Sequence, residues 1–295
     1  MIRPENLPES HRKLSILRNA EPGFTTYYTG ENAEDLAHLR SCSVLLKSGF
    51  GHLAPEGVNV VETPRPQVAF YRLSKGFEED YLPFHCLEQK SGAWIHPDAQ
   101  IHASASIGPG CVIGPCRIGA SVKVGPNCTI YAKSDISDGV EISGGSVIGA
   151  SGMMWAWDGK DKVFLSQLGS VRIEAECNIG SNVTIVRGSA NEETVIGNGS
   201  CIAHGSMIGH GCQIGPQNHL ANSVALGGSV SSGAGCFFGS GSVVSPSKTL
   251  TNEVVLGAGA VLTSSATRSG VYLGLPAKWK SELSERMSGI PKWKG

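Results

Sequence analysis

Aromatic and charged residues are scarce in this sequence of 295 residues, and long apolar runs are missing. Phe, Trp and Tyr make up 6% of the chain and charged residues 17%. The 24 Lys and Arg against 25 Asp and Glu give a net charge of -1, so the basic footprint of a nucleic-acid-binding protein is not present. No run of roughly eighteen apolar residues occurs, so we expect no transmembrane helix. The polar N-terminus has no apolar signal core, which predicts a cytoplasmic protein.

Glycine is abundant, with 39 residues, and it accompanies a six-residue aliphatic repeat. The most regular run is Ile196, Ile202, Ile208, Ile214, Leu220, Leu226, Phe238, Val244, Leu250, Leu256 and Leu262, with Ser232 as its break. A short fixed period over this length is typical of a solenoid, and the six-residue period is that of the parallel β-helix, whose tight corners use glycine. Three such repeats make one coil of about eighteen residues, so the sequence predicts about nine stacked coils.

The repeat covers only part of the chain, which predicts three regions. Residues 1–93 lack the six-residue period and mix helix-like with strand-like runs, so we expect a small α/β domain there. The β-helix is expected over residues 94–265, with an inserted loop at residues 151–170 where the period fails. Residues 266–295 form a basic tail, in which a short helix is predicted over residues 276–287.

Nine cysteines raise the question of disulfides or a metal site. Six of them lie two residues before a ladder aliphatic, namely Cys111, Cys116, Cys128, Cys177, Cys212 and Cys236. Because side chains two apart on a strand point the same way, these thiols are expected inside the β-helix, in a slot that elsewhere holds Ala, Ser or Val. The paired Cys/His spacing of zinc sites is missing, so no metal is predicted.

Several motifs of the chain resemble those of a known enzyme family. They are QLG at 167–169, VRI at 171–173, TIVRG at 184–188, ETVIGNG at 193–199, IGHGCQIG at 208–215 and SGVYLGLPAKW at 269–279. In these motifs the chain is similar to the UDP-3-O-acylglucosamine N-acyltransferases of lipid A biosynthesis. The resemblance implies a left-handed β-helix, a homotrimer with active sites in the clefts between subunits, and an N-terminal domain that holds the uracil of a UDP-sugar. It also implies transfer of an acyl group from acyl carrier protein to a sugar amine, with no permanently bound cofactor.

Such a transfer needs a base for the attacking amine and a donor for the oxyanion. His210 lies two residues beyond the ladder residue Ile208, which places it at a corner, and the resemblance implies that it is the catalytic base. Gly228 lies one coil of about eighteen residues later, directly over His210, and the resemblance implies that its N–H faces the oxyanion. The alternative is an ordinary exposed histidine and an ordinary corner glycine.

Substrate contacts are predicted at three further places. Met154 and Trp155 in the inserted loop can wall a lipid groove or pack on the protein itself. The resemblance implies that Tyr27 stacks on uracil, and filling a core is the alternative. His204 occupies the same repeat position as His210 one face earlier, so it is expected to point toward a different cleft. The basic tail can dock the acidic carrier protein or remain solvated.

Other positions depart from the family's pattern. Val186, Gly211 and Ser247 stand where the family has Asp, Asn and His, and Gly30 and Ala33 replace its uracil-binding Asn and Tyr. These departures leave three hypotheses open. The first is transfer from acyl carrier protein to the amine of a UDP-linked amino sugar. The second is an acetyl-CoA-dependent N- or O-acetyltransferase of a nucleotide sugar, and the third is a non-catalytic β-helix.

Overall fold

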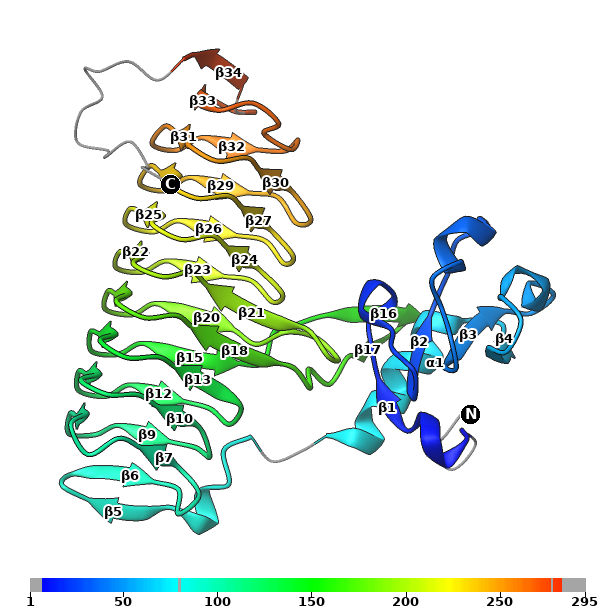
Figure 1. Ribbon diagram of the computed structural model, residues 1–295, viewed down its shortest axis with the longest axis horizontal. Helices are drawn as coiled ribbons and strands as arrows, with labels where there is room; N and C mark the ends of the chain where they lie inside the picture. The colour runs from blue at the N-terminus through cyan, green and yellow to red at the C-terminus, as the bar shows by residue number, and fades with distance from the viewer. Residues whose placement is uncertain (1–6, 79–80, 277, 283–295) are drawn as a thin grey trace. The chain divides into compact units, whose positions relative to one another are not determined.

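The computed structural model describes residues 7–78, 81–276 and 278–282, and its contacts divide the chain into two compact units (Figure 1). The described parts of residues 1–79, 151–169 and 189–192 form the first unit, and those of residues 80–150, 170–188 and 193–295 form the second. The division at residues 93 and 265 stays a prediction. None of the described helices is long and apolar enough to cross a membrane.

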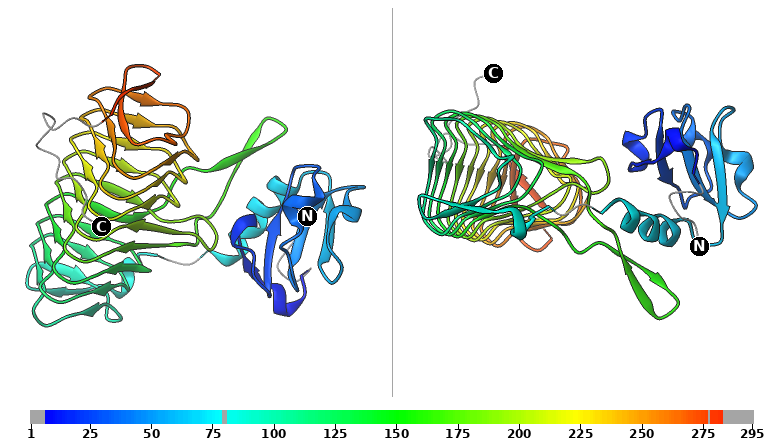
Figure 2. Two further views of the ribbon diagram at one scale, coloured as in Figure 1. Left: turned by 45° about the horizontal axis from the view of Figure 1, so that its top comes forward. Right: turned by 90° about the horizontal axis from the view of Figure 1, so that it is seen from below.

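The second unit is a parallel β-helix in which each coil adds one short strand to each of three faces (Figures 1 and 2). The first face consists of β7 (Gln100–Ile101), β10 (Arg117–Ile118), β13 (Ser134–Ile136), β18 (Ser170–Ile173), β21 (Glu193–Ile196), β24 (Gln213–Ile214), β27 (Ser231–Ser232) and β30 (Thr249–Leu250). The second face consists of β8 (Ser106–Ile107), β11 (Lys123–Val124), β14 (Glu141–Ile142), β19 (Asn178–Ile179), β22 (Cys201–Ile202), β25 (His219–Leu220), β28 (Phe237–Phe238), β31 (Val254–Leu256), β33 (Gly270–Leu273) and β34 (Lys278–Ser281). The third face consists of β5 (Glu88–Lys90), β6 (Ala93–Ile95), β9 (Val112–Ile113), β12 (Thr129–Ile130), β15 (Val147–Ala150), β20 (Thr184–Val186), β23 (Met207–Ile208), β26 (Ala225–Leu226), β29 (Val243–Val244) and β32 (Val261–Leu262).

The ladder residues fill the interior of the β-helix, as the period predicted. Strands of successive coils pair in register, so that Ile185 lies on Ile208 and Ile208 on Leu226, all three buried. The run from β6 to β32 in the third face corresponds to the predicted nine coils. A long column of stacked aliphatic side chains is therefore the core of this unit.

The predicted cysteine slot is confirmed. The six cysteines belong to the same core, each at most 7% exposed. Burial raises the pKa of the Cys177 and Cys236 thiols to about 11, so both stay protonated at neutral pH. They pack as small apolar groups.

A buried polar pair crosses the core where Ser232 interrupts the ladder. Asn218 stands in the cysteine slot and is 1% exposed, and Ser232 is 6% exposed. The Asn218 amide donates to Ser232 Oγ (3.0 Å) and to the carbonyls of Gly215 and Gly233 (2.9 Å each). Its oxygen accepts the N–H of Cys236 at 2.5 Å. The amide is thereby satisfied inside an apolar column, which is the condition for burying it at low cost.

Replacing Asn218 with leucine, which is similar in size, is expected to lower the free energy of unfolding by about 2 kcal/mol, because the Cys236 N–H and the Ser232 hydroxyl lose their partner. Asn218→Ser is the control. Serines in the same slot, Ser200 and Ser206, already accept a main-chain N–H one coil on, each at 3.1 Å. Urea unfolding should therefore show a smaller loss for serine, and equal losses would contradict this account.

The first unit contains a parallel sheet, one described α-helix and a hairpin. The sheet has the order β1 (Lys13–Leu14), β2 (Phe24–Tyr27), β3 (Ser43–Lys47) and β4 (Asn59–Thr63). Helix α1 (Pro66–Ser74) begins at a proline, whose fixed φ suits the first helical position, and buries Phe70, Tyr71 and Leu73. Short 3₁₀ helices occupy residues 9–11, 17–19, 33–36, 51–53 and 75–77 here, and residues 84–86 in the second unit.

The inserted segment folds as an antiparallel hairpin of β16 (Trp155–Asp158) and β17 (Asp161–Phe164). Alternation along the strands sends side chains to opposite sides. Ala156 and, just beyond β17, Leu165 are buried in the cluster that contains Phe70 and Tyr71 of α1, whereas Trp155 is 40% exposed. The hairpin thus belongs to the core of the first unit.

The prediction of a C-terminal helix is wrong for the described part of the tail. Strand β34 replaces it and pairs antiparallel with β33, because the outermost coil offers a free edge whose main-chain groups need partners. Trp279 is held there by its Nε1, which donates to the Ser269 carbonyl (3.0 Å), and by the Arg268 guanidinium 3.9 Å from its ring centroid. Residues 277 and 283–287 of the predicted helix lie outside the described residues.

Candidate functional site

His210 lies at the edge where the chain passes from the third face to the first, which we call the His210 edge. Both excursions leave the β-helix at this edge. Residues 151–169 connect β15 to β18, and residues 187–192 connect β20 to β21. A solenoid accepts insertions at its corners, since a loop there does not disturb the ladder. The points where both segments leave and rejoin the β-helix therefore lie on the same edge as His210.

In-register pairing stacks the corners of this edge into a column. The ladder residues Ile185, Ile208, Leu226 and Val244 follow one another in successive coils. Two residues beyond each of them are Arg187, His210, Gly228 and Pro246, respectively. His210 therefore has the Arg187 corner on one side and the Gly228 corner on the other.

The imidazole of His210 lies against the Cα of Gly228. A Cβ added at Gly228 would be 2.7 Å from both Cδ2 and Cε1 of the ring, and closer still to Nε2. The His210 carbonyl also accepts the N–H of Ser229 at 2.7 Å. The predicted position of Gly228 over the histidine is thus confirmed, and the missing side chain leaves the space that the half-buried ring occupies.

The N–H of Gly228 differs from its neighbours in its hydrogen bonding. On either side of it, Gly227 donates to the Val244 carbonyl (2.9 Å) and Ser229 to the His210 carbonyl. Among the residues that the structure describes, none accepts a hydrogen bond from the Gly228 N–H. A main-chain donor beside an imidazole is the pair of groups that acyl transfer requires.

Gly211, directly after His210, adopts a φ of +65° that favours glycine. Its N–H donates to Thr194 Oγ1 at 2.8 Å, and the Thr194 hydroxyl donates to the Val186 carbonyl at 2.7 Å. Thr194 is fully buried. Gly211, which stands at the position of the family's Asn, therefore has its main-chain N–H bound to a buried hydroxyl.

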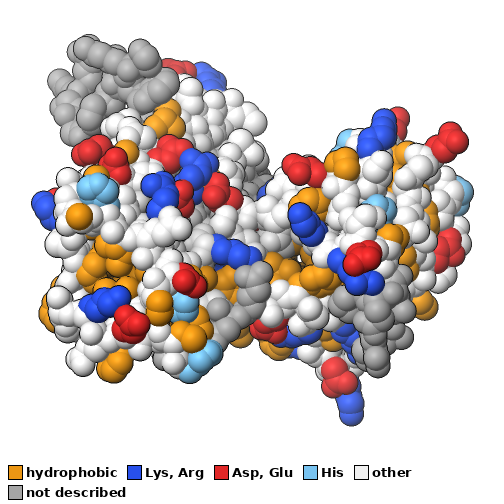
Figure 3. Space-filling model, turned by 60° about the horizontal axis from the view of Figure 1, so that its bottom comes forward, with side chains coloured by type: hydrophobic (Ala, Val, Ile, Leu, Met, Phe, Trp, Pro, Cys, Tyr) orange, Lys and Arg blue, Asp and Glu red, His pale blue; other side chains and the backbone are white. Residues whose placement is uncertain are grey.

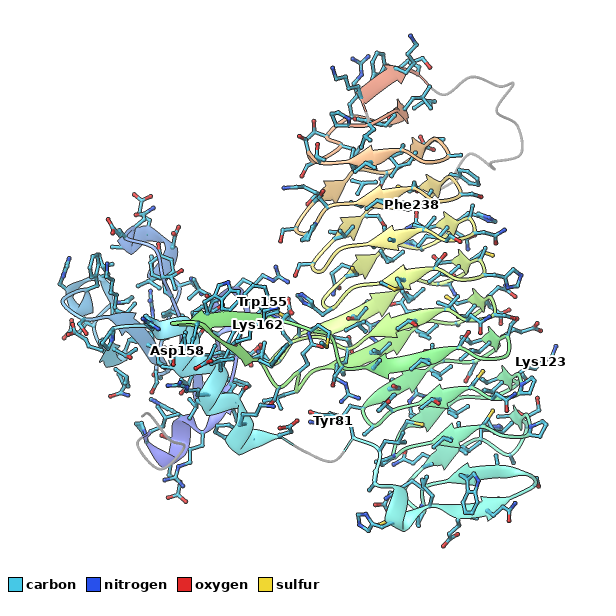
Figure 4. The ribbon with its side chains drawn as sticks, turned by 180° about the vertical axis from the view of Figure 1, so that it is seen from behind. Tyr81, Lys123, Trp155, Asp158, Lys162 and Phe238 are labelled. Carbon is cyan, nitrogen blue, oxygen red and sulfur yellow. The ribbon has the colours of Figure 1, made fainter. Side chains whose placement is uncertain are left out.

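The neighbouring corner holds a buried arginine. Arg187 is 1% exposed, and its Nε donates to the Gly149 carbonyl at 2.7 Å. Its guanidinium lies 3.5 Å from the ring centroid of Tyr81, labelled in Figure 4, and 5.5 Å from that of Tyr131. A cation in this position is stabilised by the aromatic faces. Arg187 occupies the corner one coil before that of His210.

Sequence reasoning assigned no role to Arg187 or Thr194. Both lie within quoted motifs, TIVRG and ETVIGNG, and they stand at the two ends of the excursion between Val186 and Thr194. That break in the period was the available signal, because side chains at the ends of an insertion must satisfy the main-chain groups that the ladder no longer pairs.

Of the other positions considered in the β-helix, His204 lies apart from the His210–Gly228 pair and Ser247 lies beside Gly228. His204 is at the edge between the second and third faces, a different edge from that of His210, as predicted. Its Nδ1 accepts the N–H of Ser181 at 2.8 Å, and its role in substrate binding stays a prediction. Ser247 is exposed one coil beyond Gly228, whose carbonyl accepts its N–H at 2.9 Å.

The remaining candidates belong to the first unit. The Tyr27 ring centroid lies 4.9 Å from that of Phe70 and 6.3 Å from that of Tyr71. Burial, followed by the neighbouring Tyr71, raises the pKa of Tyr27, so the phenol stays protonated. Met154 contacts the same core cluster. Packing inside the unit accounts for both side chains, and their substrate contacts stay predictions.

Trp155 lies on the solvent side of the hairpin. Its ring meets that of Trp157 edge-on at 4.9 Å, and Lys162 Nζ lies 4.5 Å from its centroid (Figure 4). A cleft of about 260 Å³ in this unit is lined by Thr63, Pro64, Arg65, Val68, Ala69, Arg72 and Asp158. The Asp158 carboxylate pairs with both arginines of the cleft, which offsets one of their two positive charges.

The described side chains form no metal-binding cluster, and charges of both signs lie on the face seen in Figure 3. Within the described ranges no group of three or more His, Cys, Asp or Glu side chains is arranged to hold a metal ion. Basic and acidic side chains are scattered over the face seen in Figure 3, as the net charge of -1 suggests.

No model of a known protein family matches the sequence. Two solved structures share the fold. UDP-N-acetylglucosamine O-acyltransferase from Moraxella catarrhalis superposes with a TM-score of 0.60 at 24% identity, over 70% of this chain and 78% of that one. UDP-N-acetylglucosamine acyltransferase from Francisella novicida gives a TM-score of 0.58 at 27% identity, over 64% of this chain and 67% of that one.

Relatives found by sequence match over a larger share of the chain than these two structures do. UDP-3-O-acylglucosamine N-acyltransferase from Delftia acidovorans is 32% identical over 285 residues, which cover 92% of this chain and 83% of that protein. The proteins of the same name from Bordetella pertussis and Coxiella burnetii are each 28% identical, over 89% and 88% of this chain and 79% and 80% of theirs. The chain is therefore an acyltransferase and belongs to the UDP-3-O-acylglucosamine N-acyltransferase family.

Proposed function

We propose that this chain moves an acyl group from acyl carrier protein to the amine of a UDP-linked 3-O-acylated glucosamine, a step of lipid A biosynthesis. The acceptor is the one in the name of the relatives. The observation that carries the proposal is the contact of His210 with Gly228, which brings an imidazole and a main-chain N–H without a described acceptor to one edge. Both excursions of the chain also leave and rejoin the β-helix on this edge.

In this mechanism His210 acts as the general base. The sugar amine attacks the thioester carbon while the imidazole removes the amine proton, and the new C–N bond replaces the C–S bond. The Gly228 N–H donates to the oxyanion of the tetrahedral intermediate. The proton held by the imidazole then passes to the departing pantetheine thiolate. Histidine suits this exchange because its ordinary pKa lies near neutral pH.

We place the reaction in a homotrimer, in the cleft between the His210 edge of one protomer and the face of the next. A single edge offers one wall, whereas a site that holds an acyl chain and a nucleotide sugar needs two. Tyr27 would hold the uracil, and Met154 and Trp155 would contact lipid. His204, at another edge, would contact substrate in the neighbouring cleft.

An acetyl-CoA-dependent acetyltransferase of a nucleotide sugar is the second candidate. Gly211 and Ser247 favour it, because a glycine and an exposed serine stand where the family has the side chains of Asn and His. Both candidates use the same base and oxyanion donor. They differ in the donor that delivers the acyl group and in the acceptor, which for the second candidate is an amine or a hydroxyl of a nucleotide sugar.

The donor can be identified by turnover and by thermal shift. With UDP-3-O-acylglucosamine as acceptor, mass spectrometry should show an N-acylated product with acyl carrier protein thioesters and none with acetyl-CoA. A carrier protein at a hundred times its Kd should stabilise the fold by about 2.7 kcal/mol. UDP-N-acetylglucosamine, whose amine is blocked, is the control acceptor. Stabilisation and turnover with acetyl-CoA alone would favour the second candidate.

A further inference from the structure

Three corners of the His210 edge share one main-chain hydrogen bond. At these three a residue with positive φ donates its N–H to a carbonyl one coil below. Lys133 donates to Pro115 (3.2 Å), Ser229 to His210 (2.7 Å) and Ser247 to Gly228 (2.9 Å). This bond fixes the corner peptide of these coils against the coil beneath.

At Gly211 the acceptor is a side chain instead. Gly211 has the same left-handed φ as the corner residues above it, but in the coil below, the chain leaves the β-helix after Val186. The N–H of Gly211 donates to Thr194 Oγ1 at 2.8 Å. Thr194 lies just after the excursion, in β21, and its hydroxyl donates to Val186, the last residue before it. One hydroxyl thus joins both ends of the excursion to the corner of His210.

The hydrogen bond from Gly211 to Thr194 restrains the peptide group of His210 itself. The N–H of Gly211 and the carbonyl of His210 belong to the same peptide group. The carbonyl accepts the N–H of Ser229 from the coil above, and the N–H is held by Thr194. The peptide plane is therefore fixed from both sides, and with it the direction in which the imidazole leaves the backbone.

We infer that Thr194 is a positioning residue for His210, whose hydroxyl replaces the missing main-chain acceptor and aims the imidazole at Gly228. The inference rests on the proposed function of His210. Without the hydroxyl, Gly211 has no acceptor beneath it and the corner can rotate. A base displaced by about 1 Å can lose on the order of a hundredfold in rate.

The test compares Thr194→Val, which keeps the shape and removes the hydroxyl, with Thr194→Ser, which keeps the hydroxyl. Ser200→Ala is the matched control. Ser200 is also fully buried, and its hydroxyl likewise accepts a main-chain N–H, that of Asn218, and donates to a carbonyl, that of Gly215, both at 3.1 Å. It lies at the edge between the first and second faces, away from His210.

Thr194→Val is expected to lower kcat by about ten- to a hundredfold with KM changed less than about threefold. Thr194→Ser should restore kcat to within about threefold of the parent, and Ser200→Ala should leave it within about twofold. Urea unfolding should show similar losses for Thr194→Val and Ser200→Ala, because each removes one buried bridging hydroxyl. Equal kcat values for these two variants would overturn the inference.

A second readout does not depend on turnover. In the full-length protein, the NMR signals of the His210 ring should shift in Thr194→Val and stay unchanged in Ser200→Ala. Unchanged His210 signals in Thr194→Val would overturn the inference, even if no acyl donor that supports turnover is found. Turnover that survives His210→Ala would contradict the proposed function, whereas turnover lost in His210→Ala but kept in Thr194→Val would remove only the positioning role.

Discussion

Replacing His210 with alanine is expected to lower kcat by about 10²–10⁴-fold, the usual contribution of a general base. The ring is half-buried at a corner, and its removal takes no ladder residue out of the core, so the fold should persist. Steady-state rates with acyl carrier protein thioester and UDP-3-O-acylglucosamine measure the effect. Circular dichroism and urea unfolding check that the variant is folded.

His219→Ala is the control for His210→Ala. His219 is exposed on β25, outside the His210 edge, where it stacks on Phe237 at 5.2 Å between ring centroids. Its loss should change kcat by less than about twofold, in the range of an ordinary surface substitution. Undiminished turnover in His210→Ala would exclude this residue as the base, and equal losses in both variants would point to a general effect of histidine removal.

Replacing Gly228 with alanine is expected to lower kcat by about 10²–10³-fold. The φ of Gly228 lies outside the left-handed region, so the backbone accepts a side chain, but the new methyl group overlaps the imidazole of His210. The ring must move off the position from which it faces the oxyanion donor. The same steady-state assay measures this loss.

A double-mutant cycle separates this displacement from other effects of the methyl group. In the His210→Ala background there is no ring to displace, so Gly228→Ala should cost less than about threefold more. Losses that multiply in the double variant would mean that the methyl group blocks the ligand or the N–H directly. Parental kcat in the single variant would contradict the close contact between the two corners.

The repeat alone was enough to predict the β-helix, because every sixth residue must face the core in each coil. It also located the slot of the cysteines and the stacking of Gly228 on His210, since both follow from counting residues along coils of known length. These features depend on local periodicity, which a single sequence displays directly.

The details beyond the period depend on contacts between segments that are distant in the sequence. The tail pattern suggested a helix, yet the free edge of β33 recruits Lys278–Ser281 as a strand. Thr194 and Arg187 were not predicted to act near His210, because their partners depend on how the chain re-enters the ladder after an excursion. Tyr27 meets Phe70 and Tyr71 through packing of a sheet and a helix, which no repeat describes.

The strands that pair antiparallel at the two ends of the second unit have a consequence for assembly. Strand β5 pairs antiparallel with β6 at one end of the third face, and β34 pairs antiparallel with β33 at the far end of the second. A stack of parallel coils with bare ends would invite further copies to add end to end and grow into fibres. Both terminal strands are short and carry charged side chains, Glu88 and Lys90 in β5 and Lys278 and Lys280 in β34, so these edges disfavour such polymerisation.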